Sequence, residues 1–385
     1  MTKPFPLARW ALPVLAAAAL AACGGSDEPR YTSMVNFGDS LSDVGSYRVG
    51  SVAALGGGKF TVNGPNGLNW TEHLAQRLEV AAPCAAQTGL LPNVPGLVGA
   101  PVTSVGGCQN YAQGGARVTS PVGPHSVALQ NAPFFRATIG MTATPVQTQI
   151  TTHLSRTGGS FSGTELVTVM AGANDLFMNL NAVAAAAQGG NAAVGAALAA
   201  GWSEAAQTAV AAGGAGAVDA AAAAAVQNMA QAGAALATLV RQQVLAKGAG
   251  QVLVANVPDV GNTPLALERD AATRQLITTL AVTFNTQLQT GLQGAPVVWA
   301  DVFARGREQV AAPARFGLTN ITGMACSTDV ALNPLGGSSL ACTQRSTTAA
   351  DTDGYLYADD VHPTPRGNRL IADYVIERLD SAGAL

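Results

Sequence analysis

Two segments far apart in the sequence carry the residue types of nucleophilic catalysis. Ser40 directly follows an apolar run and the residues Phe37-Gly38-Asp39, and Asp359 and His362 lie three residues apart near the other end of the chain. A serine hydroxyl becomes a good nucleophile only when a base takes its proton, and a histidine base needs a carboxylate that orients it. These three side chains predict acyl-transfer chemistry, with Ser40 as nucleophile.

Each segment taken alone also has a structural interpretation. A serine after a strand often caps a helix, and a histidine in an acidic turn is often only a loop residue. The chain has four histidines, His73, His125, His153 and His362, and only the last has an acidic partner at this spacing. Ser42 stands where a Gly-x-Ser-x-Gly elbow has its second glycine, which disfavours an ordinary α/β-hydrolase.

Two further segments supply candidate donors for an oxyanion. The glycine pair Gly114-Gly115 allows backbone N–H groups to approach a ligand closely, and Asn174 follows an apolar run at 166–170. A backbone N–H or an asparagine amide aimed at a developing oxyanion contributes about 3 kcal/mol of transition-state stabilisation. The alternative is that Gly115 is an ordinary turn residue and Asn174 a turn or cap residue, with no part in binding an oxyanion.

The elements that must position these residues alternate along the chain. Apolar, β-rich runs occur at 32–37, 166–170, 251–257 and 297–302, and helical patterns occur at 70–78, 271–292 and 367–379. Continuous apolar runs are typical of parallel strands that are covered on both faces. The pattern predicts one open α/β sandwich domain over residues 31–385.

Three regions depart from this alternation. Residues 179–245 are rich in alanine, which predicts a helical insertion that either caps the active site or only thickens the domain. Residues 81–109 and 315–348 are rich in glycine, proline and cysteine, and we expect both to form rims of a substrate cleft.

The candidate catalytic residues fall in four blocks that together resemble the GDSL or SGNH hydrolase family. In chain order the blocks are Phe37-Gly38-Asp39-Ser40-Leu41-Ser42-Asp43, Asn110-Tyr111-Ala112-Gln113-Gly114-Gly115, Gly172-Ala173-Asn174-Asp175 and Asp359-Asp360-Val361-His362-Pro363. Residues 66–70 and 257–261 are also similar to segments of that family.

The resemblance implies a role for each block. Ser40 would be the nucleophile, Asp359 and His362 the acid and base, and the oxyanion hole would consist of Ser40 N–H, Gly115 N–H and the Asn174 side chain. Gly114 is an alternative to Gly115. The implied fold is a flavodoxin-like three-layer α/β/α sandwich with a parallel sheet of about five strands. No cofactor and no metal are implied.

The resemblance also implies the reaction, the hydrolysis of acyl esters as in carboxylesterases and lipases. Deacetylation of a polysaccharide and acyl transfer to another acceptor are alternatives on the same fold. A surface lipoprotein that binds ligands without catalysis is the alternative outside enzymes. The long alanine-rich insertion departs from compact family members, so the shape of the pocket stays open.

The N-terminus is typical of an export signal. Lys3 and Arg9 precede a short apolar stretch at 10–20, too short to span a bilayer comfortably. Leu20-Ala21-Ala22-Cys23 resembles a bacterial lipobox. We therefore expect a signal peptide at 1–22, lipidation of Cys23, a flexible tether at 23–30 and an outer-membrane lipoprotein. A plain signal peptide of a secreted protein is the alternative.

Four cysteines remain after Cys23, and an even number in an exported protein favours disulfides. Three pairings of Cys84, Cys108, Cys326 and Cys342 are possible, and we favour the two that close short loops, Cys84–Cys108 and Cys326–Cys342. No Cys-x-x-Cys motif supports zinc.

The overall composition bears on the partners. Of the 385 residues 48% are hydrophobic and only 11% charged, with a formal net charge of −3, which disfavours nucleic acid as a partner. We expect a monomer that takes a small-molecule or lipid ester.

Overall fold

A parallel sheet lies at the centre of the computed structural model, which describes residues 1–2 and 30–385. Residues 3–22 of the predicted signal peptide, Cys23 and all of the tether except its last residue lie outside the described residues. The strand order is β1-β4-β5-β6, with β1 at Met34–Gly38, β4 at Leu166–Met170, β5 at Gln251–Ala255 and β6 at Val298–Ala300. All neighbouring strands are parallel, so their carboxyl ends meet at one edge.

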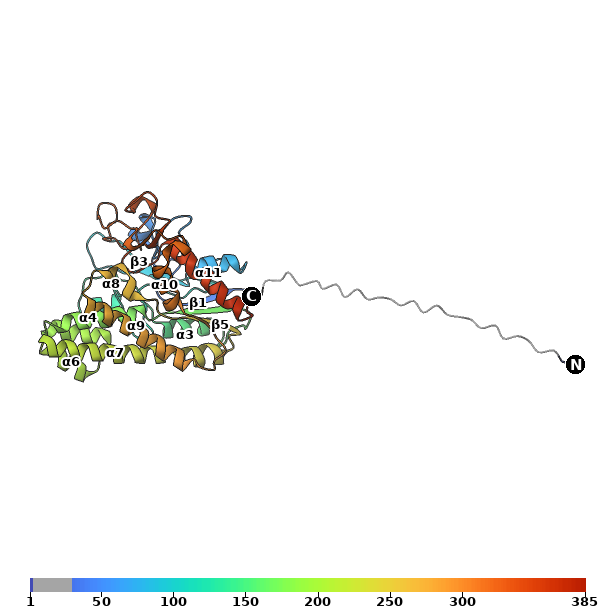
Figure 1. Cartoon of the computed structure of the whole chain (residues 1–385), viewed down its shortest axis with the longest axis horizontal. Coiled ribbons are helices and arrows are strands. Elements are labelled where there is room, and N and C mark those ends of the chain that lie inside the picture. The colour runs from blue at the N-terminus through green and yellow to red at the C-terminus, as the bar shows by residue number, and fades with distance from the viewer. Residues whose placement is uncertain (3–29) are drawn as a thin grey trace.

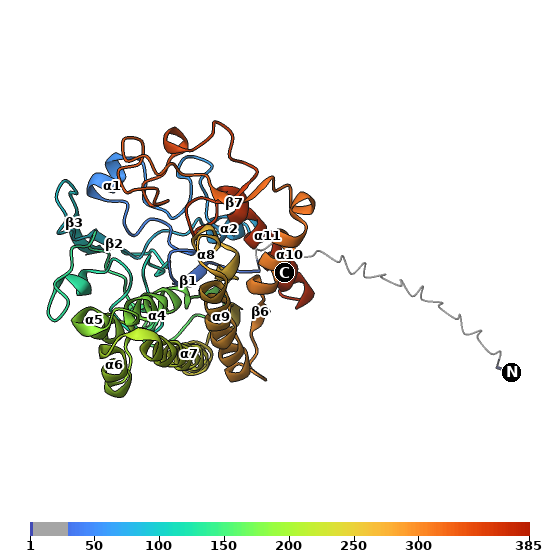
Figure 2. The same cartoon turned by 60° about the vertical axis from the view of Figure 1, so that its left-hand side comes forward.

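The strands are apolar because both faces of the sheet are covered. Successive side chains point to opposite faces, so Val35 and Phe37 belong to one hydrophobic cluster while Met34 belongs to another. Figures 1 and 2 show helices α3 (Val146–Arg156), α7 (Gly214–Leu239) and α9 (Ala271–Gly291) on one side of the sheet and α2 (Trp70–Arg77) and α11 (Pro365–Ser381) on the other. The predicted three-layer α/β/α sandwich is confirmed.

The helices match the predicted alternation closely. Their bounds are α1 Gly50–Ala54, α2 Trp70–Arg77, α3 Val146–Arg156, α4 Ala173–Ala186, α5 Gly190–Ala200, α6 Glu204–Ala211, α7 Gly214–Leu239, α8 Pro264–Leu267, α9 Ala271–Gly291, α10 Val302–Ala311 and α11 Pro365–Ser381. Short 3₁₀ turns lie at Val127–Gln130, Leu245–Lys247, Val260–Asn262, Pro313–Phe316 and Gln344–Ser346, and a π turn lies at Val240–Val244. No helix in the described part of the chain has the length and apolar character to cross a membrane.

Two small strand pairs, which the sequence did not predict, lie outside the main sheet. Strands β2 (Gln87–Leu90) and β3 (Ala100–Ser104) are antiparallel, and β7 (Asn320–Met324) pairs in parallel with β8 (Tyr355–Tyr357). Disulfides join Cys84 to Cys108 and Cys326 to Cys342, the pairing that the sequence favours.

The main sheet has four strands instead of about five. The position beside β1 is taken by residues 109–113, where Asn36 N–H donates to Gln109 O (3.0 Å) and Tyr111 N–H donates to Asn36 O (2.8 Å). This segment pairs with β1 through a single bridge, Asn36 with Asn110, and Ala85 also pairs with Asn110. The pairing is therefore too short to form a fifth strand.

The alanine-rich insertion packs as helices α4 to α7. The longest, α7, buries one stripe against α9 and its neighbours, composed of Ala217, Ala221, Ala225, Met229, Gly233, Leu236 and Ala237. Small side chains let two helices approach closely, and at Gly233 an added Cβ would lie 2.4 Å from Phe284 O. Alanine in this insertion therefore provides close packing as well as helix propensity.

Gly233→Ala tests this close approach. The new methyl group meets backbone rather than a flexible side chain, so α7 must shift, and we expect a loss of about 1–3 kcal/mol in the free energy of unfolding. The matched control is Gly216→Ala in the exposed first turn of α7, where an added Cβ meets nothing within 4 Å. The control should gain about 0.5–1 kcal/mol. Equal effects of the two substitutions in urea denaturation would contradict this packing.

Candidate active site

Ser40 lies at the carboxyl edge of the sheet because the end of β1 is fixed from two sides. The side chain of Gln149 on α3 accepts from Gly38 N–H (2.9 Å) and donates to Gly38 O (2.8 Å). On the other side, a Cβ at Gly38 would lie 2.3 Å from Met170 O, so only glycine fits. The chain then turns sharply and presents Ser40 above the sheet edge, where parallel sheets bind ligands.

His362 connects Ser40 to Asp359. Its Nε2 lies 2.8 Å from Ser40 Oγ, and its Nδ1 lies 2.9 Å from each carboxylate oxygen of Asp359. Asp359 Oδ1 also accepts from the backbone N–H groups of His362 (2.7 Å) and Val361 (3.0 Å), which fixes the carboxylate relative to the ring. The structure thus brings together the three side chains that the sequence assigned to nucleophile, base and acid.

The charge distribution suits proton transfer at Ser40. Burial alone would raise the pKa of Asp359, but the His362 charge and hydrogen bonds from His362 and Ser339 hold that pKa well below its usual value. Burial alone would lower the pKa of His362, but Asp359, Asp360 and Asp39 raise it above its usual value. A carboxylate that stays ionised can stabilise an imidazolium beside it.

The three expected oxyanion donors line one cleft together with His362. Gly114 N–H already donates to Asp43 Oδ2 (2.9 Å), whereas the N–H groups of Ser40 and Gly115 have no acceptor among the described residues. Asn174 Nδ2 donates one hydrogen to Ala116 O (2.9 Å), and its second amide hydrogen is available to a ligand. The geometry therefore favours Gly115 over Gly114 as the donor.

A buried ion pair between Arg117 and Asp175 fixes two of the oxyanion donors, Gly115 N–H and the Asn174 amide, relative to each other. Arg117 lies two residues after Gly115, and Asp175 directly follows Asn174; Arg117 Nε donates to Asp175 Oδ1 at 2.9 Å. Asp175 Oδ2 also accepts from Val118 N–H (3.0 Å). Both charged side chains are almost fully buried, so loss of either one would leave an unpaired charge.

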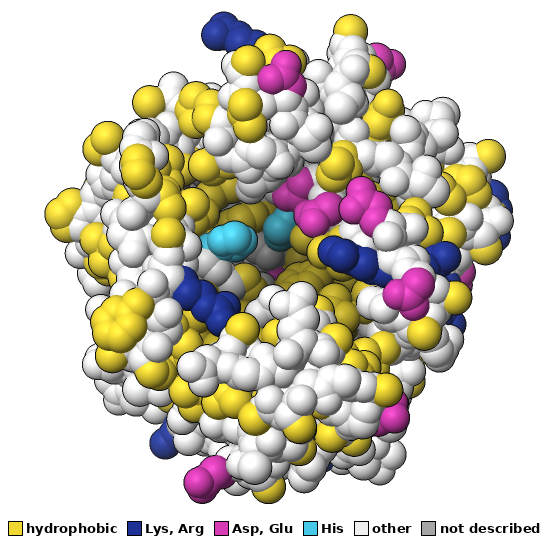
Figure 3. Space-filling view, turned by 90° about the vertical axis from the view of Figure 1, so that its left-hand side faces the viewer, with side chains coloured by type: hydrophobic (Ala, Val, Ile, Leu, Met, Phe, Trp, Pro, Cys, Tyr) yellow, Lys and Arg dark blue, Asp and Glu magenta, His cyan; other side chains and the backbone are white. Residues whose placement is uncertain are grey.

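Two hollows meet at Ser40. The larger, an open cleft of about 860 Å³, is lined by the oxyanion donors and, farther out, by charged residues such as Glu268 and Arg269. Figure 3 shows a hollow with histidine side chains, acidic groups at one rim and basic groups on two sides. The smaller hollow, about 90 Å³, is mostly apolar, and Ser40, Phe177, Val361 and His362 border both.

The sequence comparison decides the family. The model of the GDSL-like lipase/acylhydrolase family matches residues 34–375, which include all four blocks. The chain belongs to this family. Membership supports an enzyme that hydrolyses ester bonds.

Individual relatives are distant. The chain is 28% identical over 142 residues to a GDSL esterase/lipase of Arabidopsis thaliana, a match covering 34% of this chain and 37% of that protein. It is 31% identical over 143 residues to esterase EstA of Pseudomonas aeruginosa, covering 34% and 20%, and 31% identical over 85 residues to lipase 1 of Photorhabdus luminescens, covering 22% and 12%. The chain therefore matches well under two thirds of the length of these relatives.

Solved structures that resemble the chain include two lipolytic proteins. One is an extracellular lipase from Streptomyces rimosus, with 17% identity, a TM-score of 0.39 and coverage of 91% of this chain and 99% of that one. The other is a G-D-S-L family member from Veillonella parvula, with 13% identity, a TM-score of 0.37 and coverage of 90% and 96%.

The cleft of this GDSL-like chain has one of the two rims expected from sequence. Residues 315–348 contribute Met324, Thr328, residues 335–338 and Leu340 to it. Residues 81–109 contribute no residue to the cleft lining, so the expectation that they form a rim is wrong. The Cys84–Cys108 disulfide and the β2–β3 pair instead join parts of this segment to each other. Of the alanine-rich insertion, only α4 reaches the cleft, through Leu180, Asn181 and Ala184.

Several residues that support the GDSL-like site were not found from sequence. Arg117 and Gln149 lie in segments without a recognisable motif, Gln149 among several other polar residues, and their partners are distant in the chain. Residues 66–70, which did resemble the family, brace the Ser40 turn: Asn69 Nδ2 donates to Asp43 O (3.1 Å) and Trp70 Nε1 donates to Ser42 Oγ (3.1 Å). Asp359 was easier to find from sequence than Arg117 or Gln149, because it lies only three residues from its partner His362.

Asp39, next to Ser40, is a buried carboxyl group with an unpaired oxygen. Its Oδ1 accepts from Leu41 N–H (3.1 Å), but its Oδ2 has no partner among the described residues. Burial raises the pKa of Asp39 to about 7. The folded protein thus binds a proton at Asp39 more tightly than the unfolded chain, and this contribution to stability falls as pH rises from about 4 to about 7.

Asp39→Asn should remove this cost of ionisation. We expect the variant to match the wild type in thermal stability near pH 4 and to have a Tm higher by roughly a few degrees at pH 8. Asp43, whose pKa burial raises to about 6, leaves some pH dependence in the variant. Asp219→Asn on the exposed surface of α7 is the control and should leave the curve unchanged. A variant less stable than the wild type at pH 8 would refute the interpretation.

Proposed function

We propose that the protein is a serine ester hydrolase in which Ser40 attacks the ester carbonyl and forms an acyl-enzyme. The observation that carries this proposal is the continuous contact from Ser40 Oγ through the His362 ring to the Asp359 carboxylate. The same cleft contains the N–H groups of Ser40 and Gly115, which have no acceptor in the described part of the chain. Membership of the GDSL-like family supports the same reaction class.

The reaction has two steps, acylation of Ser40 and deacylation by water, and His362 accepts and returns one proton in each. His362 Nε2 takes the proton of Ser40 Oγ as that oxygen bonds to the carbonyl carbon, and Asp359 stabilises the imidazolium. The N–H groups of Ser40 and Gly115 and the Asn174 amide hold the oxyanion. His362 then protonates the leaving alkoxy oxygen. Water, deprotonated by His362, attacks the acyl-enzyme and releases the acid as Ser40 regains its proton.

The different shapes of the two hollows support a proposal for where each part of the ester binds. The acyl part stays bound to Ser40 after the alcohol has left, and water must then enter. An open cleft lets the alcohol leave and water arrive, so the alcohol part occupies the cleft of about 860 Å³ and the acyl part the narrow apolar hollow. Since an apolar cavity of about 150 Å³ holds benzene, the narrow hollow suits an acyl chain of about four carbons.

Ser40→Ala tests the function together with the substrate. A series of p-nitrophenyl esters from acetate to laurate should give the highest kcat/KM at acetate to butyrate and a steep fall beyond. The Ser40→Ala variant should lose at least about 10³-fold of this activity while its circular dichroism and Tm stay those of the wild type.

Two outcomes would contradict the proposal in different ways. Unchanged turnover by Ser40→Ala would remove Ser40 as the nucleophile. Preference for laurate with full dependence on Ser40 would keep the mechanism but replace the short-chain esterase with a lipase. Esterified carbohydrates with short acyl groups are the natural second panel, because charged and polar groups line the open cleft.

Export and anchoring complete the proposed function. We propose cleavage of residues 1–22 and lipidation of Cys23, which the lipobox-like Leu20-Ala21-Ala22-Cys23 and two disulfides support. Residue 30 lies beside the C-terminus, where Arg30 Nη1 donates to Leu385 O (2.9 Å). The cleft opens on another side of the molecule (Figures 1 and 3), so an anchored enzyme would act on esters that arrive from solvent.

Cys23→Ser checks the anchor. Cells given radiolabelled palmitate should incorporate label into the wild-type protein and not into the variant, and the variant should leave the membrane fraction. Equal labelling of both proteins would show that Cys23 is not the acylated residue. Esterase activity of the soluble variant serves as the folding control.

A further inference from the structure

The segment 59–63, between α1 and α2, contacts the turn that holds Asp359 and His362. The ring of Phe60 lies against the His362 ring, with centroids 4.9 Å apart and planes inclined by 36°. The next residue, Thr61, donates its hydroxyl to Pro363 O (3.0 Å). Two consecutive side chains of one segment thus hold the base and the residue that follows it.

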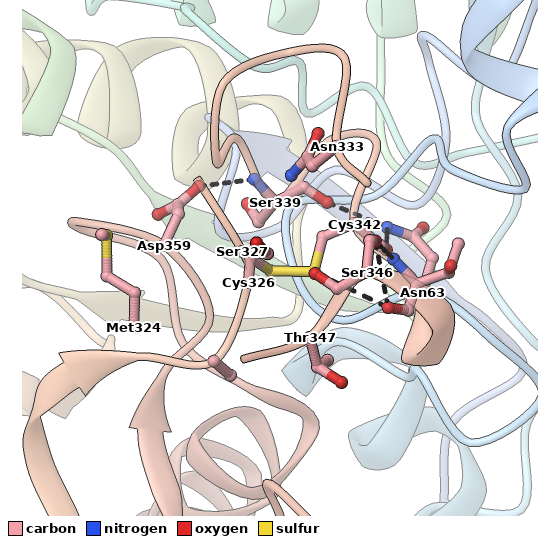
Figure 4. Close-up of a disulfide and its surroundings, with 12 residues drawn as sticks. Asn63, Met324, Cys326, Ser327, Asn333, Ser339, Cys342, Ser346, Thr347 and Asp359 are labelled. Carbon is pink, nitrogen blue, oxygen red and sulfur yellow. Dashed lines mark hydrogen bonds between the residues drawn. A yellow bond between two sulfur atoms is a disulfide. The ribbon is translucent and has the colours of Figure 1, made fainter. Parts of the chain in front are cut away.

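Asn63 extends the same segment to a loop on the other side of Asp359. The asparagine is 1% exposed, and its Nδ2 lies 3.0 Å from both Ser339 O and Cys342 O. Its backbone N–H also donates to Cys342 O (2.8 Å). Figure 4 shows Asn63 facing this loop beside the Cys326–Cys342 disulfide.

The loop that Asn63 contacts is itself hydrogen-bonded to Asp359. Ser339 N–H donates to Asp359 Oδ2 at 2.9 Å, the contact drawn at the upper left of Figure 4. The disulfide joins Cys342 to Cys326, whose N–H donates to Ala358 O (2.8 Å), next to Asp359 in the chain. The loop is therefore fixed by Asn63 and by a covalent bond to Cys326, which is itself hydrogen-bonded to the residue before Asp359.

We propose that Asn63 is a positioning residue for Asp359, acting through the disulfide-closed loop 326–342 and the Ser339 N–H. This inference rests on the proposed function for its catalytic meaning. Its structural content, that Asn63 controls the Asp359–His362 pair, is independent of that function.

The two oxygens of the Asp359 carboxylate differ in where their hydrogen-bond donors come from. Asp359 Oδ1 has donors on its own turn, whereas Oδ2 has one donor from elsewhere, Ser339 N–H. If the loop shifts, Oδ2 loses this partner in a buried site, and an ionised carboxylate there becomes costlier. The carboxylate then holds His362 less firmly, and the pKa of the imidazole falls.

Three carboxyl groups raise the pKa of His362. Asp359 and Asp360 lie on its own turn, and Asp39 faces it from the turn after β1. Asn63 is neutral and replacing it changes no charge. Asn63 Nδ2 also donates to Lys59 O (2.9 Å) and Thr61 O (3.0 Å), on either side of Phe60, so loss of its side chain also frees the ring that lies against His362. Removal of the Cys326–Cys342 disulfide leaves these two bonds in place, so a shift in the His362 titration that both variants share reports movement of the carboxylate.

The test is a titration of His362 by NMR on protein labelled at its four histidines. His362→Gln assigns the signal. Asn63→Ala and the double variant Cys326→Ala/Cys342→Ala should both lower the pKa of His362 and weaken the low-field resonance of its Nδ1 proton. In ester hydrolysis both should lose about 10²-fold in kcat with KM unchanged, and the acid limb of the pH profile should move to lower pH.

Two controls separate positioning from general stability. Asn179 is another buried asparagine, and its side-chain partners Asp175 and Trp202 belong neither to the loop 326–342 nor to the Asp359 turn, so Asn179→Ala should lower the Tm but leave the His362 titration unchanged. Cys84→Ser/Cys108→Ser removes the other disulfide and should behave likewise. An unchanged His362 titration in folded Asn63→Ala and folded Cys326→Ala/Cys342→Ala would overturn the proposal. Because the titration needs no substrate, it decides the proposal even if the protein hydrolyses none of the esters tested.

Discussion

A single line of hydrogen bonds runs from Ser40 through His362 and Asp359 to the backbone of Ser339, and much of the surrounding structure serves to hold it. The line joins residues that are separated by some 320 positions in the chain. None of its members could stay in place alone, because each is on a turn rather than inside a helix or strand. Other bonds fix both ends of the line: the hydrogen bonds of Gln149 to Gly38 hold the turn at Ser40, and the disulfide-closed loop holds Ser339.

The parallel sheet makes this convergence possible. The strands β1 and β4 end at the same edge, so Ser40 and Asn174 emerge side by side although about 130 residues separate them. The buried pair Arg117–Asp175 then fixes the Gly115 loop to the start of α4. Arg117 also donates to the carbonyl groups of Ala199 and Ala200 at the end of α5 (3.1 and 2.8 Å). The helical insertion is thus attached to the site although most of it lies outside the cleft.

What the sequence could predict depended on how local each signal was. The strands at 166–170 and 251–255 were found because both faces are buried and the apolar run is continuous. The Asp359–His362 turn was found because both residues lie in one short segment. Asn63 and Arg117 were not, because their roles come from partners 58 or more residues away that only the folded chain brings near. The short strand pairs were missed because each is stabilised by disulfides and loop contacts rather than by a periodic pattern.

Covalent labelling with a fluorophosphonate shows whether Ser40 is a nucleophile that His362 activates. A fluorophosphonate reacts by forming a bond between a serine Oγ and phosphorus, with loss of fluoride and of the serine proton to the base. We expect one adduct per chain, located by peptide mass spectrometry on Ser40, formed rapidly by the wild type and far more slowly by His362→Gln. An adduct on another serine, or a folded wild-type protein that stays unlabelled, would contradict it.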